Sequence, residues 1–405
     1  QEGDLIKVFE VNGIDALVTQ NAQDKHRPYL HPIIAPNSKV ELTQYSPGHH
    51  KHQTGLYWGF TRVNGTGASD ETLKKWFYNP DKSPKIQQQI GRDFFHHPAD
   101  NYWQKISADI LIEEGESVED TYFVVKEIIA GLLEESVIPV IIGATQDITY
   151  PAYRAFDGIV NMINLVSIDS RFDFGIDDEL ISSHSYMSKI ITDKPNNLFN
   201  FSNLGYQSYF NAQEEKDLME RLFFDAHRLG ELTADMTLAE PTLRDANMVS
   251  LDTRAIRASE MGMSDNFSPN GLTGREVCTI ARYAGISDKV NVFGIYEMDN
   301  NMQSFQLVAQ LIWYFIEGHN YRIKESPYIN REDFTKYNVP TETEQLVYYK
   351  SNLTERWWIE VPSIYSAHNK TQTASLLPCT EKDYLDACDQ NIPERWFKAY
   401  KKGHS

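Results

Sequence analysis

Aspartate and arginine alternate at two places in the sequence where an apolar run ends. Asp169, Arg171 and Asp173 follow the run MINLVSI. Asp252 and Arg254 follow the run ANMVSL. Carboxylates at strand ends commonly hold metal ions, and they also serve as general acids and bases. The arginines are unexpected there, because a guanidinium stays protonated and has no lone pair to give to a metal.

Two further apolar runs end in polar groups. VIPVIIG is followed closely by Gln146 and Asp147, and KVNVFGIY is followed by Glu297. Side chains two residues apart on a strand face the same way, and parallel sheets bind ligands beyond their carboxyl ends. We therefore expect three aspartates and two arginines to converge above one sheet. Spacing alone also allows an ordinary ion-pair network, with Glu297 paired to Arg254 or Arg171.

The segments that must position these residues alternate between helix and strand from about residue 106. Apolar runs that are polar on neither face are typical of a parallel sheet covered by helices on both sides. The sequence thus predicts an α/β fold, preceded by a β-rich N-terminal segment. The predicted strands are 137–143, 162–169, 246–252 and 289–297, and the predicted helices are 118–136, 273–287 and 301–318.

Three regions of different character divide the chain. Residues 1–105 carry short apolar runs between Gly, Pro and Asn, which indicates strands and turns, with one helix expected from about Ser69 to Phe77. Residues 106–330 form the predicted α/β domain. Residues 331–405 are an aromatic and proline-rich extension that we expect to pack on that domain. The tryptophans expected to hold it there are Trp357, Trp358 and Trp396.

Composition excludes several classes of partner. The 405-residue chain is 41% hydrophobic, so it can bury a core, and its net charge of −19 disfavours nucleic acid and anionic membranes. No apolar stretch is long enough to predict a membrane-spanning helix. Three cysteines without a C-x-x-C pair indicate reduced thiols in a cytoplasmic protein, although one disulfide or a removed export signal before Gln1 stays open.

Histidine gathers in the first hundred residues. Seven of the twelve histidines precede residue 98, and SPGHHKH holds three of them in four positions. Imidazole suits Zn, Cu and Ni, so a metal site there is one interpretation and solvated loops are the other. Farther along, His227 lies in a DAH triplet, but its surroundings have helical spacing. We therefore expect His227 on a helix surface.

The strand ends resemble the motifs of the ureohydrolases, the family of arginase, agmatinase and formiminoglutamase. Members carry G-G-D-H-S, then D-A-H-x-D, S-x-D-x-D and a later glutamate, and this chain reads GATQD, DSRFD, SLDTR and EMDN. SPNGLTGRE is similar to the family's G-G-L-T-x-R-E run. The resemblance covers about residues 106–400, is nearest to a divergent bacterial branch, and implies an arginase/deacetylase-like three-layer fold.

The resemblance implies two manganese ions on two histidines and four aspartates, with a bridging hydroxide that attacks the guanidino or formimino carbon. Asp169 and Asp252 match the bridging aspartates, and Asp173 matches a terminal ligand. The family counterpart of Glu297 contacts the guanidinium of substrate. His184 lies near a family His-Gly that shapes the substrate pocket, but Ser185 stands in place of the glycine.

Arg171 and Arg254 occupy the two ligand positions that one of the two metals does not share with the other. We expect the two guanidiniums to fill the place of that cation and to pair bidentately with the aspartates. At the other metal position Gln146 replaces a histidine. The residues that still offer oxygens there are Gln146, Asp169, Asp173 and Asp252. The expectation is a degenerate centre without a cofactor, or alternatively with one Mn²⁺ or another divalent ion.

The sequence thus predicts a ureohydrolase-fold protein without hydrolase activity, retained for binding or assembly. The resemblance implies a homo-oligomer, a trimer or hexamer, and a protein partner is also conceivable. One alternative is an amidinohydrolase, similar to formiminoglutamase, that cleaves C–N bonds of linear amidines with one metal or an altered site. Its candidate catalytic residues are Asp169, Asp173, Asp252 and Glu297, with Arg171 or Arg254 holding a carboxylate of the substrate.

The first 105 residues suggest another alternative. HRPYLHPIIAPN, YSPGHHKHQTGLYWGFTRVNG and GRDFFHHPADNYW partly resemble a bacterial β-sandwich family labelled PmoA-like. A carbohydrate- or metal-binding module centred on this segment is therefore a further hypothesis. Both a mosaic gene and a joining of two separate sequences are compatible with the arrangement.

Overall fold

The structure is a computed structural model. It describes six strands within the first 112 residues and then residues 115–402, apart from 144, 160–161, 176–180, 263–266, 300, 343 and 363–374. Near the N-terminus, β1 (Asp4–Ile6) pairs with β4 (Thr43–Tyr45), and β2 (Ile14–Leu17) pairs with β3 (Ile33–Pro36), both antiparallel. The helix expected near Ser69 and the seven N-terminal histidines lie outside the described residues.

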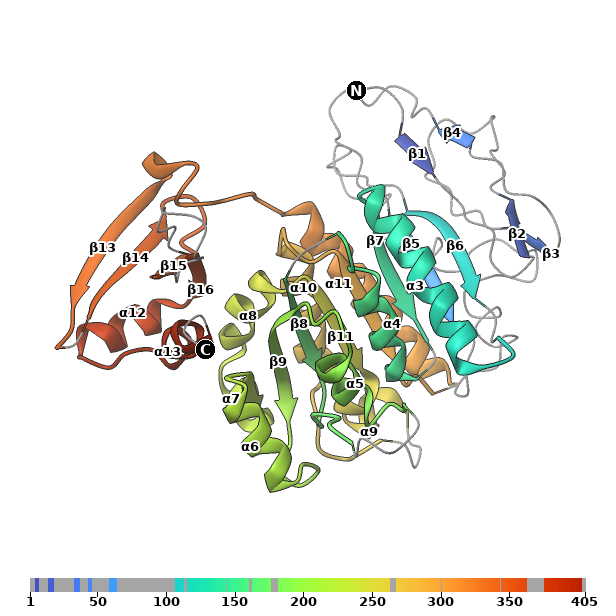
Figure 1. Cartoon of the computed structure of the whole chain (residues 1–405), viewed down its shortest axis with the longest axis horizontal. Helices are drawn as coiled ribbons and strands as arrows, with labels where there is room; N and C mark the ends of the chain where they lie inside the picture. Colours follow the sequence, from blue (N-terminus) through green and yellow to red (C-terminus); the bar gives the residue numbers. More distant parts are fainter. Residues whose placement is uncertain are drawn as a thin grey trace.

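A parallel eight-stranded sheet forms the centre of the molecule (Figure 1), which confirms the predicted fold class. Its strand order is β10-β9-β8-β11-β12-β7-β5-β6. The apolar run before residue 64 contributes one of these strands, because β5 pairs with both β6 and β7. The bounds are β5 Trp58–Val63, β6 Ile106–Ile112, β7 Ile138–Ile142, β8 Ile163–Ile168, β9 Leu198–Tyr206, β10 Asp225–Arg228, β11 Met248–Asp252 and β12 Val292–Tyr296.

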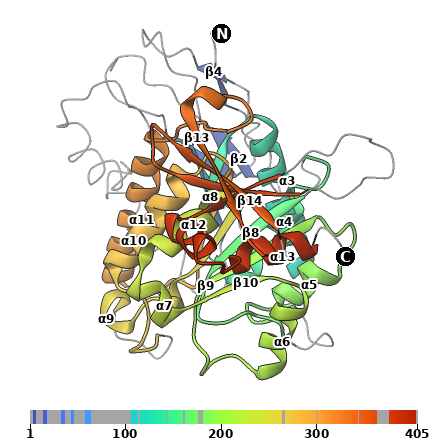
Figure 2. The same cartoon turned by 90° about the vertical axis from the view of Figure 1, so that its left-hand side faces the viewer.

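Two apolar layers cover the two faces of the sheet, because successive strand residues point to opposite sides. In β7, Val140 and Ile142 belong to one buried cluster and Ile141 belongs to the other. Figure 2 shows the sheet between the two helical layers. The first layer holds α7 (Leu229–Ala234), α8 (Ala239–Asp245), α9 (Ala258–Met261), α10 (Gly274–Ile286) and α11 (Met302–Asn320), and the second holds α3 (Val118–Glu134), α4 (Thr149–Arg154), α5 (Tyr186–Thr192) and α6 (Gln213–Arg221).

Local sequence signals account for the predicted helix starts. At the start of α3, the Ser117 side chain accepts a hydrogen bond from the backbone N–H of Asp120. The Asp120 carboxylate in turn accepts one from the backbone N–H of Ser117. Thr273 and Glu276 form the same reciprocal pair at the start of α10. Such capping satisfies backbone groups that the first helical turn leaves without partners.

His227 corrects one prediction. The segment DAHR forms β10, the edge strand next to β9, and not a helix. The helical spacing of its surroundings is real, since α6 and α7 flank it. Pairing with β9 overrides that local pattern over four residues, because strand preference depends on tertiary contacts.

The C-terminal residues form a separate antiparallel sheet with two helices. Trp358 packs under the Arg244 guanidinium of α8, 4.4 Å from it, whereas Trp357 and Trp396 lie in the extension's own apolar cluster. Figure 1 shows this unit beside α8. Its elements are β13 (Phe334–Pro340), β14 (Gln345–Ser351), β15 (Trp357–Val361), β16 (Ser375–Cys379), α12 (Glu381–Cys388) and α13 (Glu394–Lys402). Within the described residues, no helix combines the length and hydropathy needed to cross a bilayer.

Candidate functional site

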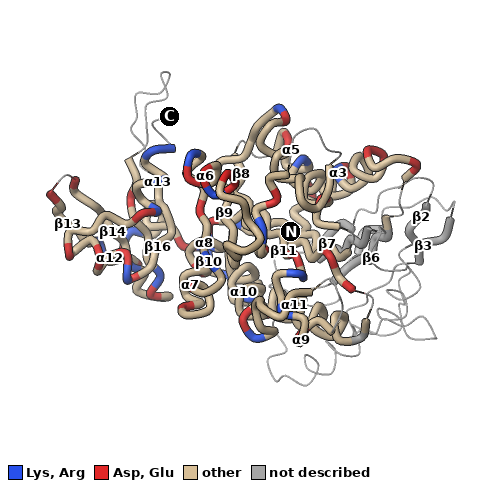
Figure 3. Tube along the Cα trace, turned by 90° about the horizontal axis from the view of Figure 1, so that it is seen from below, with Lys and Arg blue, Asp and Glu red and all other residues tan. Residues whose placement is uncertain are grey.

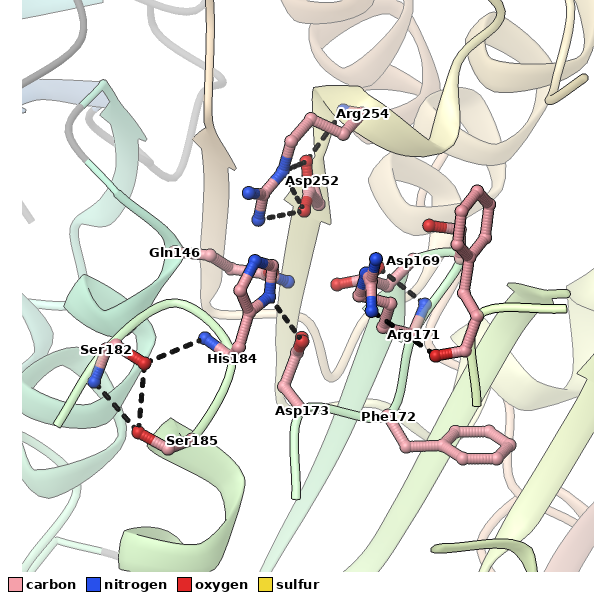
Figure 4. A network of polar contacts seen from close by, with 12 residues as sticks. Gln146, Asp169, Arg171, Phe172, Asp173, Ser182, His184, Ser185, Asp252 and Arg254 are labelled. Atoms are coloured by element: carbon pink, nitrogen blue, oxygen red, sulfur yellow. Dashed lines mark hydrogen bonds and ion pairs between the residues drawn. The ribbon is translucent and has the colours of Figure 1, made fainter. Parts of the chain in front are cut away.

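The residues singled out from the sequence meet at the carboxyl end of the sheet (Figure 4). Asp169 follows β8, Asp252 ends β11 and Glu297 follows β12. Gln146 opens a 3-10 turn after β7. Parallel strands bring these four chain positions to one edge, although 151 residues separate Gln146 from Glu297.

Arg254 is locked against two acidic side chains. Its Nε lies 2.9 Å from Asp252 Oδ2 and 3.1 Å from Oδ1, and its NH2 lies 2.7 Å from Oδ2. The same NH2 is 3.4 Å from Glu297 Oε1. The backbone N–H of Arg254 also donates to Asp252 Oδ1. Although burial opposes it, Asp252 holds the pKa of Arg254 above its usual value. The expected bidentate pairing is therefore present at this position.

Arg171 departs from its prediction. Its backbone N–H donates to Asp169 Oδ1 at 2.8 Å, but its guanidinium lies 4.9 Å from the Phe210 ring and donates to the Phe210 carbonyl at 3.3 Å. The structure records no ion pair between Arg171 and Asp169, Asp173 or Asp252. An aromatic face attracts a flat cation, and Phe210 supplies one from the loop after β9. Only one of the two arginines therefore pairs with the aspartates.

Asp169 and Asp173 form a buried acidic pair. Their exposed fractions are 1% and 3%, and neither Asp169 Oδ2 nor Asp173 Oδ2 has a hydrogen-bond partner in the described structure. Burial, and then the charges of Asp173 and Asp252, raise the pKa of Asp169. Burial is also the main cause that raises the pKa of Asp173, to about 7. Two carboxylates in this setting share a proton or require a cation.

Gln146 adds a third oxygen to this pair. Its side-chain amide donates to Ser167 Oγ at 3.2 Å and Ser250 Oγ at 3.4 Å. These two acceptors fix the amide orientation, so that Gln146 Oε1 is the atom left without a partner. The backbone N–H of Gln146 donates to Glu297 at 3.0 Å. The serine hydroxyls that orient it come from β8 and β11, and their role was not predicted from the sequence.

His184 belongs to the site more closely than its sequence context indicated. Its Nδ1 lies 3.3 Å from Asp173 Oδ1, and its side chain is 51% exposed. Burial, and then the charges of Arg254 and Arg171, lower the pKa of His184. The signal for it was its place near the family's His-Gly position. It lies at the exposed mouth of the otherwise buried pair (Figure 4).

Two residues of the site have strained backbone. Asp173 has φ of 58° and Glu297 has φ of 59°. Side chains other than glycine seldom adopt this left-handed region, although aspartate and asparagine tolerate it best. Strain of this kind persists where the surroundings fix a side chain in one place. It indicates that the positions of the Asp173 and Glu297 carboxylates are tightly determined.

The Asp173→Asn variant should gain more stability at pH 8 than at pH 5. The pKa of about 7 in the folded state exceeds the unfolded value near 4, so the stability from this group is full below about pH 4. That stability is lost as pH rises through 7, whereas asparagine does not titrate and tolerates the left-handed backbone. We expect a gain about 2 kcal/mol larger at pH 8, or several degrees in melting temperature.

Thermal melts in EDTA across pH 5–8 measure this difference. Asp217→Asn is the matched control, because Asp217 lies exposed on α6. A melting-temperature shift in Asp173→Asn that is the same at both pH values would contradict the assigned protonation of the buried pair.

The two metal positions implied by the ureohydrolase motifs differ in how well their residues suit a cation. At one position both Asp252 oxygens are already occupied by Arg254, whose positive charge would repel a second cation. At the other, Gln146 Oε1, Asp169 Oδ2 and Asp173 Oδ2 are buried oxygens without partners, which are suitable donors for a hard divalent ion. In the described part of the chain, no three His, Cys, Asp or Glu side chains form a metal-binding group.

Comparison with known proteins supports the same family. The sequence pattern of the arginase family matches residues 87–316, and a family of unknown function, DUF6807, matches residues 11–117. No curated protein matches the chain. The arginase pattern begins at residue 87, before the residue 106 that the motifs predicted. The PmoA-like resemblance of the first 105 residues stays a prediction.

Two solved structures share the fold. Formiminoglutamase of Trypanosoma cruzi with Mn²⁺ is 14% identical over 68% of this chain and 97% of its own, with a TM-score of 0.53. Formimidoylglutamase of Bacillus subtilis is 13% identical over 67% of this chain and 89% of its own, with a TM-score of 0.53. At these identities the likeness concerns the fold alone. Because the arginase pattern spans more than half of the 405 residues and the fold agrees, this chain belongs to the arginase family.

Proposed function

We propose that this chain is a non-catalytic, ureohydrolase-fold binding protein in which the guanidinium of Arg254 takes the place of one manganese ion. The observation that carries the proposal is the contact of Arg254 with both oxygens of Asp252 and with Glu297. An aspartate engaged in this way has no oxygen left to bridge two metals. The paired-cation mechanism for making a hydroxide is then lost.

Glu297 supports the same conclusion from the substrate side. The resemblance assigns its counterpart to the guanidinium of substrate, and here an internal guanidinium lies 3.4 Å from it. The Glu297 carboxylate also contacts the Gln146 backbone and Ser183. A substrate amidine would have to displace Arg254 from both acids. Such displacement would leave a buried charge without its partner, which is costly.

One cation is still compatible with the residues present. Gln146, Asp169 and Asp173 would hold it, with His184 at the exposed side. A bound divalent ion would neutralise the acidic pair and polarise a ligand oxygen. We propose that Mn²⁺ or another divalent ion binds there at most once per chain.

Metal analysis of three proteins tests the proposal. The wild type should hold at most one Mn²⁺ per chain after dialysis and release no urea or ammonia from arginine, agmatine or formiminoglutamate. The triple variant Gln146→His, Arg171→His, Arg254→Asp restores the six ligands and should bind two. The single variant Arg171→His is the matched control and should stay at one or none. Two tightly bound ions in the wild type would refute the proposal.

The buried acidic pair favours one alternative, a hydrolase of linear amidines that works with a single metal. Asp169 and Asp173 would then hold the ion, with Asp252 and Glu297 near the reacting carbon and Arg171 binding a substrate carboxylate. Ammonia release from formiminoglutamate that disappears in Asp173→Asn and with EDTA would establish it. A wild type that is inactive at every Mn²⁺ concentration would exclude this single-metal hydrolase.

We also propose that the chain assembles into trimers or hexamers, as the resemblance implies. Light scattering during size-exclusion chromatography should then give a mass three or six times the 46.6 kDa of the chain. A mass of one chain at micromolar concentration would contradict this expectation.

A further inference from the structure

Three buried oxygen atoms of the candidate site have no hydrogen-bond donor among the described residues. They are Gln146 Oε1, Asp169 Oδ2 and Asp173 Oδ2. The exposed fractions of these side chains are 0%, 1% and 3%. Figure 4 shows the three side chains pointing toward one another from the turn after β7 and the loop after β8. A buried polar atom without a partner is costly, so the three oxygens indicate a site for a ligand.

The other side-chain polar atoms of the same three residues already have partners. The Gln146 amide nitrogen donates to two serine hydroxyls. Asp169 Oδ1 accepts from the backbone N–H of Arg171, and Asp173 Oδ1 lies 3.3 Å from His184 Nδ1. These contacts hold each side chain in place and leave one oxygen of each for a ligand.

The number of missing donors limits what can fill this space. A proton shared between Asp169 and Asp173 would satisfy two of the oxygens but would leave Gln146 Oε1 without a donor. A water molecule donates two hydrogen bonds and brings no charge to set against the buried carboxylates. A primary ammonium group carries three N–H donors and one positive charge. It therefore matches the three acceptors in number and the acidic pair in sign.

Other cations match the same oxygens less completely. Hard divalent ions such as Mn²⁺ favour an octahedron of six ligands, whereas this position offers three protein oxygens, one of them from a neutral amide. A guanidinium ligand would need further acceptors, but Asp252 and Glu297 are already engaged by Arg254. The fourth bond of an ammonium nitrogen leads to its carbon chain, and His184, with 51% of its side chain exposed, lies at the open side of the site.

We propose that the site binds the terminal ammonium group of a small primary amine, which donates one N–H to each of the three unpartnered oxygens. The carbon chain of the amine passes His184 toward solvent. The amine is bound without any covalent step, so the binding needs no metal-bound hydroxide. The inference rests on the proposed function, because it takes the remaining acids of the site as occupied by Arg254.

Calorimetric titration of the full chain with n-butylammonium chloride, at pH 7.5 in EDTA, tests the proposal. The net charge is −19, and Figure 3 shows acidic positions spread along the described chain, so any cation gathers near the surface. Tetramethylammonium has the same charge but no N–H donor, and it therefore measures this general attraction. We expect one n-butylammonium per chain, bound about tenfold more tightly than tetramethylammonium or better, because only the primary amine makes charge-assisted hydrogen bonds.

Gln146→Met removes one acceptor and keeps a similar volume. It should weaken the binding of n-butylammonium about tenfold and leave that of tetramethylammonium unchanged. Gln213→Met is the matched control, because Gln213 lies exposed on α6, and it should bind both amines as the wild type does. Equal affinity of the wild type for the two amines would overturn the proposal, and this comparison needs no variant to fold.

Titration with Mn²⁺ in the absence of EDTA separates this proposal from the proposed function. A wild type that holds at most one Mn²⁺ and does not bind n-butylammonium would keep the non-catalytic function and refute the amine site. A single Mn²⁺ that saturating n-butylammonium does not displace would also refute the amine site. Two tightly bound ions would refute the proposed function, and the amine site with it.

Discussion

Replacing Arg254 with methionine should lower the free energy of unfolding by about 3–5 kcal/mol. Asp252 is 2% exposed and depends on Arg254 for contacts to both of its oxygens. Methionine fills a similar volume but supplies neither charge nor donors, so a buried carboxylate is left with Asp169 and Asp173 nearby. Urea unfolding at pH 7.5 in EDTA measures the loss.

Arg282→Met is the matched control for this substitution. Arg282 makes a comparable contact, 2.8 Å from Glu317, but both side chains are about one third exposed. Exposed pairs contribute about 1 kcal/mol or less, so the control should lose little. The double variant Arg254→Met, Asp252→Leu should recover part of the loss, because it removes the unpaired charge. A loss below about 1 kcal/mol in Arg254→Met would contradict the assigned role.

Replacing Arg244 with methionine should cost a similar amount, about 3–4 kcal/mol, and should loosen the C-terminal extension. Arg244 is 5% exposed and joins the two units. Its NH2 donates to the carbonyls of Trp357 at 3.0 Å and Cys379 at 3.2 Å, its Nε lies 3.3 Å from Glu240, and its guanidinium covers the Trp358 ring. Hydrogen exchange should become faster across 357–361 and 375–379.

Lys382→Met controls for a charge change in the extension alone, since Lys382 pairs only locally with Asp386. It should leave exchange in β15 and β16 unchanged. If Arg244→Met also leaves it unchanged, the extension is held by other contacts, such as Lys398 with Asp225.

Much of the site followed from the sequence because strand ends can be recognised locally. Asp169, Asp252 and Glu297 each follow a buried apolar run, and parallel pairing then places them at one edge. The orientation of the Arg171 side chain could not be predicted from the sequence, because Phe210 in a distant loop sets it. The strand at His227 was missed for a similar reason, since only pairing with β9 distinguishes it from its helical neighbours.

The contact of Arg254 with Asp252 has a consequence for any return to a two-metal centre. Substituting aspartate at position 254 alone would set a fourth carboxylate against Asp169, Asp173 and Asp252 before histidine is available to help hold an ion. The intermediate would be less stable than either end state, because like charges would be buried together. Arg254 therefore makes its own replacement by aspartate costly unless the other metal ligands are restored first.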